Sequence, residues 1–94
     1  MEALNEAGAL RLALCDPGGA RSYHEQALGL ARELGSSWDE AHALAGLGRA
    51  ALADGQVAEA EYDLRHAYEI FLRISAAEAL PVAAELEALS MDSS

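Results

Sequence analysis

Forty residues separate two copies of one pattern in this 94-residue chain. Moving residues 41–80 back by forty positions superposes seven identical residues, all of them small or leucine: Ala3/Ala43, Leu4/Leu44, Gly8/Gly48, Leu12/Leu52, Ala13/Ala53, Ala20/Ala60 and Ala27/Ala67. A fixed period of this length indicates stacked units, because one unit cannot bury its apolar face alone. The repeat therefore predicts an all-α solenoid of antiparallel helix hairpins, an architecture whose usual role is to hold another protein.

The composition fits thin layers of helices. Hydrophobic residues make up 52% of the chain but aromatic residues only 5%, and alanine is abundant. A β-sheet core would need more β-branched and aromatic side chains. At this length we expect one small domain whose stability depends on how well its ends are covered.

The charge balance excludes some classes of partner. Six basic residues against sixteen acidic ones give a net charge of −10, which repels nucleic acid and anionic lipid. The single cysteine, Cys15, cannot form an internal disulfide, and no apolar run is long enough for a membrane span or a signal peptide. We therefore expect a soluble, cytoplasmic protein that binds neither nucleic acid nor membranes directly.

Apolar residues at helical spacing, with turn signals between them, predict five helices at residues 2–14, 17–34, 37–53, 57–74 and 76–90. Pro17, Gly35 and Gly55 mark the intervening turns. The spacing of Ser37 and Glu40 suggests a capping box at the start of the third helix, and Ser75 and Glu78 repeat it for the fifth.

This division predicts one domain over 1–90, with a first repeat at 1–36, a second at 37–74 and a capping helix at 76–90. The capping helix should bury Leu80, Leu86 and Leu89. Residues 91–94 carry no pattern and are predicted to be a disordered tail.

The conserved spacing of small and leucine residues resembles the tetratricopeptide repeat (TPR) at a forty-residue period. The residues that carry the resemblance are Leu4, Gly8, Ala20 and Ala27 in the first copy and Leu44, Leu47, Gly48, Ala60 and Ala67 in the second. Several positions depart from the family pattern: Ala7 replaces leucine, Arg11 and Ala51 replace a common aromatic, and Cys15 stands where the second copy has Gly55.

Short phrases within the repeats are also similar to the TPR tails of actinobacterial antibiotic regulatory proteins and LuxR-like ATPase regulators. These phrases lie at residues 25–28, 31–35, 40–44 and 50–55. In that family the TPR array follows DNA-binding and nucleotide-binding regions and receives signals. The resemblance implies either a sensor module of a transcriptional regulator or a small free-standing relative.

In TPR proteins the first helix of each hairpin lines a concave groove. The corresponding positions here are Glu2, Asn5, Ala9, Leu12, His42, Ala45, Arg49 and Leu52. Two repeats make a shallow trough, so the alternative is that these are ordinary solvated residues. The TPR clamp for acidic chaperone tails matches only at Asn5 and Arg49, and its lysines are absent. A partner with apolar or basic side chains suits the leucines and the acidic charge better.

The sequence offers no chemistry of catalysis. His24, His42 and His66 fall on three different helices without metal-ligand spacing, and no phosphate loop, nucleophile elbow or paired carboxylates occur. His24 is expected to fill a position between helices, and Cys15 to be an incidental thiol. We predict neither cofactor nor metal. Trp38 is expected to be a packing wedge near Leu34 and Ala41, the alternative being an exposed anchor for a partner.

Two hypotheses about binding follow. In the first, a peptide lies along the groove of helices one, three and five, where Asn5 and Arg49 fix its backbone or a carboxylate and Leu12 and Leu52 add apolar contact. In the second, the chain dimerises through the uncovered first helix, whose outer edge carries Leu4, Leu10 and Leu14.

Overall fold

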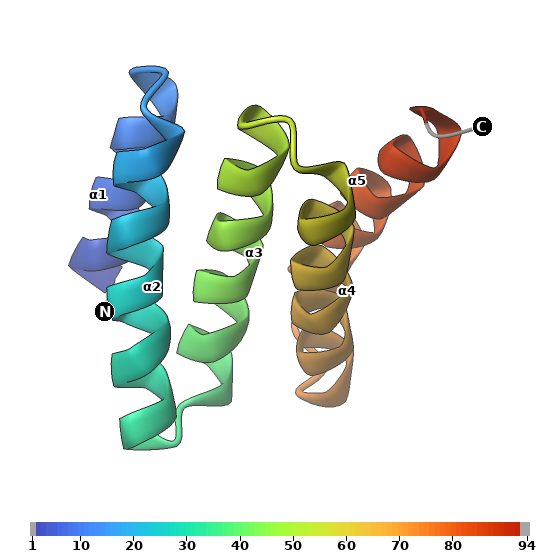
Figure 1. Cartoon of the computed structure of the whole chain (residues 1–94). Helices are drawn as coiled ribbons and strands as arrows, with labels where there is room; N and C mark the ends of the chain where they lie inside the picture. Colours follow the sequence, from blue (N-terminus) through green and yellow to red (C-terminus); the bar gives the residue numbers. More distant parts are fainter. Residues whose placement is uncertain (1, 93–94) are drawn as a thin grey trace.

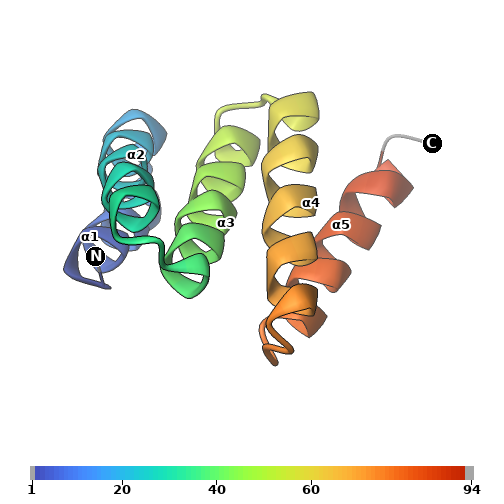
Figure 2. The same cartoon turned by 90° about the horizontal axis from the view of Figure 1, so that it is seen from below.

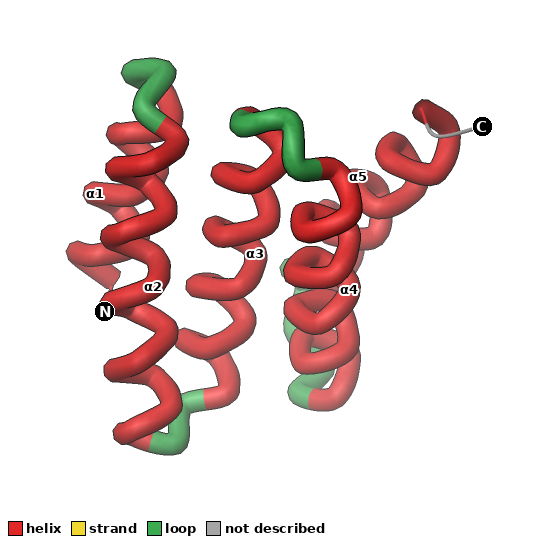
Figure 3. Tube along the Cα trace, in the orientation of Figure 1, coloured by secondary structure: helices red, strands yellow, loops and turns green. Residues whose placement is uncertain are grey.

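The computed structural model describes residues 2–92, and the helices follow the predicted order. They are α1 (Glu2–Ala13), α2 (Pro17–Leu34), α3 (Ser37–Ala53), α4 (Val57–Arg73) and α5 (Ala79–Asp92). Short turns join them, and residues 2–92 contain no strand (Figure 1, Figure 3). The prediction of an all-α hairpin fold is confirmed.

Each helix packs against the next one along the chain, and α1 also packs against α3. The helices therefore form a row from α1 to α5, with the two ends of the chain on opposite sides of it (Figure 2). The principal extents of the molecule are 39 × 31 × 17 Å, which describes a flat plate of paired helices. The fifth helix packs on α4 and runs at an angle to it.

The forty-residue period extends into the turns. Gly35 and Gly55 have φ angles of 66° and 79°, and Cys15 and Ser75, forty residues from Gly55 and Gly35, have φ angles of 61° and 56°. Left-handed backbone is easily adopted by glycine but costs a residue with a Cβ atom about 1–2 kcal/mol. The left-handed turn geometry is thus repeated in all four turns between the helices, including the two turns where this position is not glycine.

The start of α3 at Ser37 is as predicted, but its predicted cap and the predicted start of the fifth helix are wrong. The N-cap residue of α3 is Ser36 rather than Ser37: its hydroxyl accepts a hydrogen bond from the backbone N–H of Asp39 at 3.3 Å. The fifth helix begins at Ala79, three residues after the predicted start. Ser75 adopts left-handed backbone, whereas an N-cap residue needs extended backbone, so Ser75 closes the turn after α4 instead.

The large buried side chains come from the second half of the chain. The core cluster comprises Ala41, Leu44, Ala45, Ala51, Ala60, Leu64, Ala67, Ile70, Phe71, Ala79, Val82 and Leu89. The first hairpin instead buries three alanines of α2 and His24. The late start of α5 also changes which of its residues are buried: Val82 is buried, Leu86 packs against the cluster, and Leu80, predicted to be buried, is 77% exposed.

Candidate functional site

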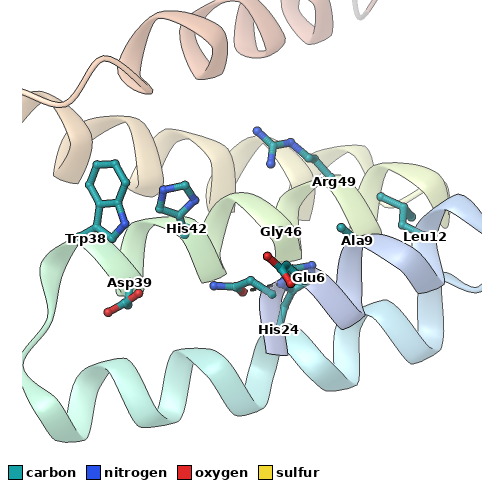
Figure 4. Close-up of a pocket in the computed structure, with 10 residues that line it drawn as sticks. Glu6, Ala9, Leu12, His24, Trp38, Asp39, His42, Gly46 and Arg49 are labelled. Atoms are coloured by element: carbon teal, nitrogen blue, oxygen red, sulfur yellow. Dashed lines mark hydrogen bonds between the residues drawn. The ribbon is translucent and has the colours of Figure 1, made fainter. Parts of the chain in front are cut away.

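A cavity of about 440 Å³ lies between the first helices of the two hairpins. Helix α1 contributes four lining residues, α3 contributes five, and α2 contributes one. They are Asn5, Glu6, Ala9, Leu12, His24, Trp38, Asp39, His42, Gly46 and Arg49 (Figure 4). Its size falls within the range of pockets that bind small ligands or single side chains, roughly 300–1,000 Å³.

His24 from α2 fills the junction of α1, α2 and α3. It is only 4% exposed, and its Nδ1 lies 2.8 Å from Oδ1 of Asn5, at hydrogen-bond distance. Gly8 and Gly46 allow this packing, since a Cβ atom on either would lie 2.5 Å or less from the imidazole ring. The predicted position of His24 between helices is confirmed. Burial, together with the charge of Arg49, lowers the pKa of His24, so the ring is neutral at pH 7.

Arg49 is already paired within the chain. Its Nε and Nη2 atoms donate hydrogen bonds of 2.9 and 2.7 Å to the two carboxylate oxygens of Glu85 on α5. The hydrogen bond to Glu85 raises the pKa of Arg49, although burial opposes this. Arg49 therefore keeps its charge, but a carboxylate of the protein occupies the fork that was predicted to hold a partner's carboxylate.

An aromatic group forms one wall of the cavity. The centroid of the Trp38 ring lies 4.6 Å from that of the His42 ring and 6.0 Å from that of the Phe71 ring. The His42 ring stands edge-on to Phe71, with their centroids 5.2 Å apart. Trp38 remains 45% exposed. It is thus held by His42 and Phe71 and keeps nearly half of its surface open. Figure 4 shows Trp38, His42 and Arg49 along the same side of α3.

His42 has one buried atom without a hydrogen bond among the described residues, its Nε2. The nearest carboxylate oxygen, Oε2 of Glu78, lies 3.6 Å away, which is slightly too long for a hydrogen bond. His42 therefore serves as an aromatic support for Trp38, and a cationic contact through its Nε2 would first have to displace Glu78.

The structure gathers most of the predicted groove residues. Asn5, Ala9, Leu12, His42 and Arg49 line the cavity. Three predicted groove positions differ. Ala45 is buried at 2% exposure, Leu52 is 42% exposed but lies outside the lining, and the side chain of Glu2 lies outside the described residues.

Sequence reasoning missed two acidic lining residues, Glu6 and Asp39. Glu6 occupies a position that the family pattern does not assign to the groove, and Asp39 lies in the first turn of α3. Asp39 does take part in the cap, because its Oδ2 accepts a 2.7 Å hydrogen bond from the Ser36 hydroxyl. The signal that would have found both is that each lies three residues before a predicted groove residue, Ala9 and His42, and so on the same helix face.

The predicted self-association edge is partly exposed. Leu4 is half-buried, whereas Leu10 and Leu14 are 61% and 63% exposed. Within residues 2–92, no group of three or more His, Cys, Asp or Glu side chains is arranged to hold a metal ion. No described helix is both long and apolar enough to cross a membrane.

The comparison with protein families gives a clear assignment. The model of the tetratricopeptide repeat matches residues 1–73, which is more than half of the chain. Searches of the curated proteins and of the solved structures found no significant match. The chain therefore belongs to the tetratricopeptide repeat family, whose members typically serve as modules for protein–protein interaction.

Proposed function

We propose that this chain is a non-catalytic module that binds a segment of a partner protein in the cavity between α1 and α3. The observation that carries this proposal is the cavity itself, a preformed hollow of about 440 Å³ lined by the first helix of each hairpin. A half-exposed tryptophan supports it, since tryptophan is enriched among the residues that dominate binding at protein interfaces.

The experiment selects binding peptides from a random displayed library and maps them by NMR chemical shifts. Peptides that bind the module should shift the resonances of the cavity residues. Ala9→Phe should weaken their binding at least about tenfold, because Ala9 is an exposed lining residue and a ring there fills the hollow. Ala58→Phe, on an exposed position of α4 outside the lining, is the matched control and should change nothing.

The choice of Ala9 avoids a difficulty with the more obvious variants. Asn5 lies at hydrogen-bond distance from His24, and Arg49 is bound to Glu85, so substituting either residue removes a contact within the protein as well as altering the cavity. Peptides that shift only residues outside the cavity, or that bind Ala9→Phe as tightly as the wild type, would rule out this function.

A second candidate function is self-association through α1. Its support is the exposure of Leu10 on α1 and of Leu14 in the turn that follows it, while α1 packs against α2 and α3. Because each copy carries a net charge of −10, a dimer should strengthen with added salt. Light scattering over a wide concentration range measures the mass. Leu10→Glu should give monomers, and a wild-type monomer at every concentration and salt level would exclude the dimer.

We also retain the sensor region of a transcriptional regulator as the biological setting, and the cytoplasm as the location. The setting is supported by the similarity of the phrases at residues 25–28, 31–35, 40–44 and 50–55 to the TPR tails of such regulators. An antibody against this chain tests it in the native host. A band well above 9.9 kDa supports a part of a larger regulator, whereas a band at that mass supports a free-standing protein.

A further inference from the structure

The cavity holds more negative charge than positive charge once its internal pairs are counted. Its charged lining residues are Glu6, Asp39 and Arg49. Arg49 is neutralised by the bidentate carboxylate of Glu85, and His24 is uncharged because burial lowers its pKa. Within the described part of the chain, neither Glu6 nor Asp39 forms an ion pair. Two carboxylates are therefore left without a cation.

The aromatic wall suits a cation as well. A guanidinium or ammonium group placed over an indole ring is attracted by the ring's electron density, and tryptophan is the strongest aromatic partner for this contact. The orientation of Trp38 is fixed by its contacts with His42 and Phe71, so little ordering is needed when a ligand binds. The 45% of Trp38 that remains exposed is available to a ligand in the cavity.

We propose that the cavity recognises an arginine side chain of a basic partner segment, which stacks on Trp38 and is attracted by the carboxylates of Asp39 on the same helix and of Glu6 on α1. This inference rests on the proposed function and names the chemistry of the partner. Arginine fits better than lysine because its planar fork both stacks on an aromatic ring and binds carboxylates with two hydrogen bonds. The net charge of −10 attracts the same partner over a longer range.

Glu85 sets this preference. Without its carboxylate, the guanidinium of Arg49 would be an unpaired cation in the wall of the cavity and would repel a basic ligand while attracting an acidic one. Glu85 lies 36 residues from Arg49 and outside the hairpins, on α5. The capping helix thus determines the charge of a cavity built by the two repeats.

The test uses the fluorescence of Trp38, which is the only tryptophan of the chain. Three acetylated and amidated peptides of leucine and alanine are titrated. They share one sequence except at the variable positions, where the first has arginine, the second its neutral isostere citrulline and the third glutamate. The arginine peptide should change the emission of Trp38 and bind at least about tenfold more tightly than the citrulline peptide, with an affinity that falls as salt is added.

Charge-neutral variants locate the contact. Glu6→Gln and Asp39→Asn should each weaken the arginine peptide about three- to tenfold, while Glu33→Gln should leave its affinity unchanged. Glu33 is an exposed residue of α2 outside the cavity, so its variant changes the net charge by the same amount. Asp39→Asn keeps an oxygen for the Ser36 hydroxyl, and circular dichroism checks that the helices are intact.

Glu85→Gln is the sharpest variant, because it should weaken the arginine peptide and strengthen the glutamate peptide. Equal affinities for arginine and citrulline would overturn the inference, as would an equal loss from Glu33→Gln, which would mean that only bulk charge acts. If acetylarginine amide binds as tightly as the arginine peptide, the cavity recognises a single arginine rather than a segment of a protein, and the inference is overturned. If library peptides bind in the cavity without a basic residue, the proposed function holds and this inference alone fails.

Discussion

In both hairpins the two helices approach each other closely at a glycine, but the side chain that packs against this glycine differs. Gly8 in α1 faces His24 in α2, and forty residues later Gly48 in α3 faces Leu64 in α4. A Cβ atom on Gly8 would lie 2.5 Å from the nearest ring atom of His24, and one on Gly48 would lie 2.7 Å from Cγ of Leu64. The close approach of the two helices is therefore the same in both hairpins, while the side chain that fills it is polar in one and apolar in the other.

The two filling side chains, Leu64 and His24, contribute differently to the stability of the domain and to the cavity. Leu64 is fully buried in a cluster with Ile70 and Phe71, whereas His24 needs Asn5 as a polar partner and lines the cavity. A buried polar group adds little net stability, because its hydrogen bond only replaces one made with water. The second hairpin and α5 thus carry most of the apolar core, whereas the polar filler of the first hairpin lines the cavity that both hairpins form.

The largest effect should come from truncating the two fillers in turn. Leu64→Ala is expected to lower the free energy of unfolding by about 2–5 kcal/mol, because it removes apolar contacts and leaves a cavity. His24→Ala should cost less than half as much, about 1–2 kcal/mol, because a hydrogen bond of modest net value is lost. Urea unfolding followed by circular dichroism measures both. Equal costs would contradict the view that the apolar filler stabilises the fold more than the polar filler does.

The next effect tests the tight contact around His24. Gly46→Ala should destabilise the fold by about 1–3 kcal/mol, since overpacking is costly and the new Cβ atom would lie 2.3 Å from the ring. Gly29→Ala is the matched control on an exposed turn of α2 with no atom within 4 Å of the new Cβ. It should stabilise the fold by up to about 1 kcal/mol through helix propensity.

A double variant separates crowding from other causes. Combining Gly46→Ala with His24→Ala removes the ring that the new methyl group would meet, so the cost of Gly46→Ala should shrink markedly. Full additivity of the two costs would mean that Gly46 is needed for some reason other than the approach of His24.

A smaller effect compares the helix caps that stand forty residues apart. Asp16 caps α2 by accepting a 3.1 Å hydrogen bond from the backbone N–H of Gly19, whereas Gln56 at the start of α4 makes no such bond with its side chain. Asp16→Ala should cost about 1 kcal/mol and Gln56→Ala nearly nothing, while Gln56→Asn should stabilise by about 0.5–1 kcal/mol. Thermal unfolding orders the three variants. A loss from Gln56→Ala as large as that from Asp16→Ala would refute this account of the caps.

The sequence predicted the fold well because helices are specified locally. The period of forty, the turn glycines and the apolar spacing located all five helices, and the small residues at Gly8 and Gly48 marked the close contacts. The errors fell where local signals compete. Ser75 looks like a helix cap in the sequence but takes left-handed backbone, as Gly35 does forty residues earlier, and this moved the start of α5 and the burial of Leu80.

The site was predicted less well because its electrostatics depend on contacts far apart in the sequence. Arg49 was identified as a groove residue, but its pairing with Glu85 depends on where α5 packs. The spacing of the repeat does not predict where α5 packs. Likewise, Trp38 contacts Phe71 on α4 in addition to His42 on its own helix, because α3 presents this face to α4. Most of the cavity positions were predictable from the family pattern, whereas the neutralisation of Arg49 depends on where α5 packs.

The smallest expected effect distinguishes the two fillers by pH. His24 has a pKa below its ordinary value of 6.5, so below that pH the unfolded chain binds a proton that the folded chain resists. Stability from the neutral ring is therefore complete above pH 6.5 and is lost as pH falls from 6.5 towards the folded-state pKa. His24→Leu, which copies the second hairpin, removes this dependence. Burial raises the pKa of Asp63, which acts in the opposite direction but equally in both proteins.

The measurement is urea unfolding of the wild type and of His24→Leu at pH 7.5 and at pH 5.5. The wild type should lose more free energy of unfolding between the two values than the variant does, and the difference should vanish between pH 7.5 and 8.5, where His24 is neutral in both states. Equal losses of free energy of unfolding in the wild type and in His24→Leu would mean that the His24 ring is protonated in the folded protein. Its hydrogen bond with Asn5 would then have the imidazolium as donor, and the base of the cavity would carry a positive charge next to Arg49 instead of a neutral ring.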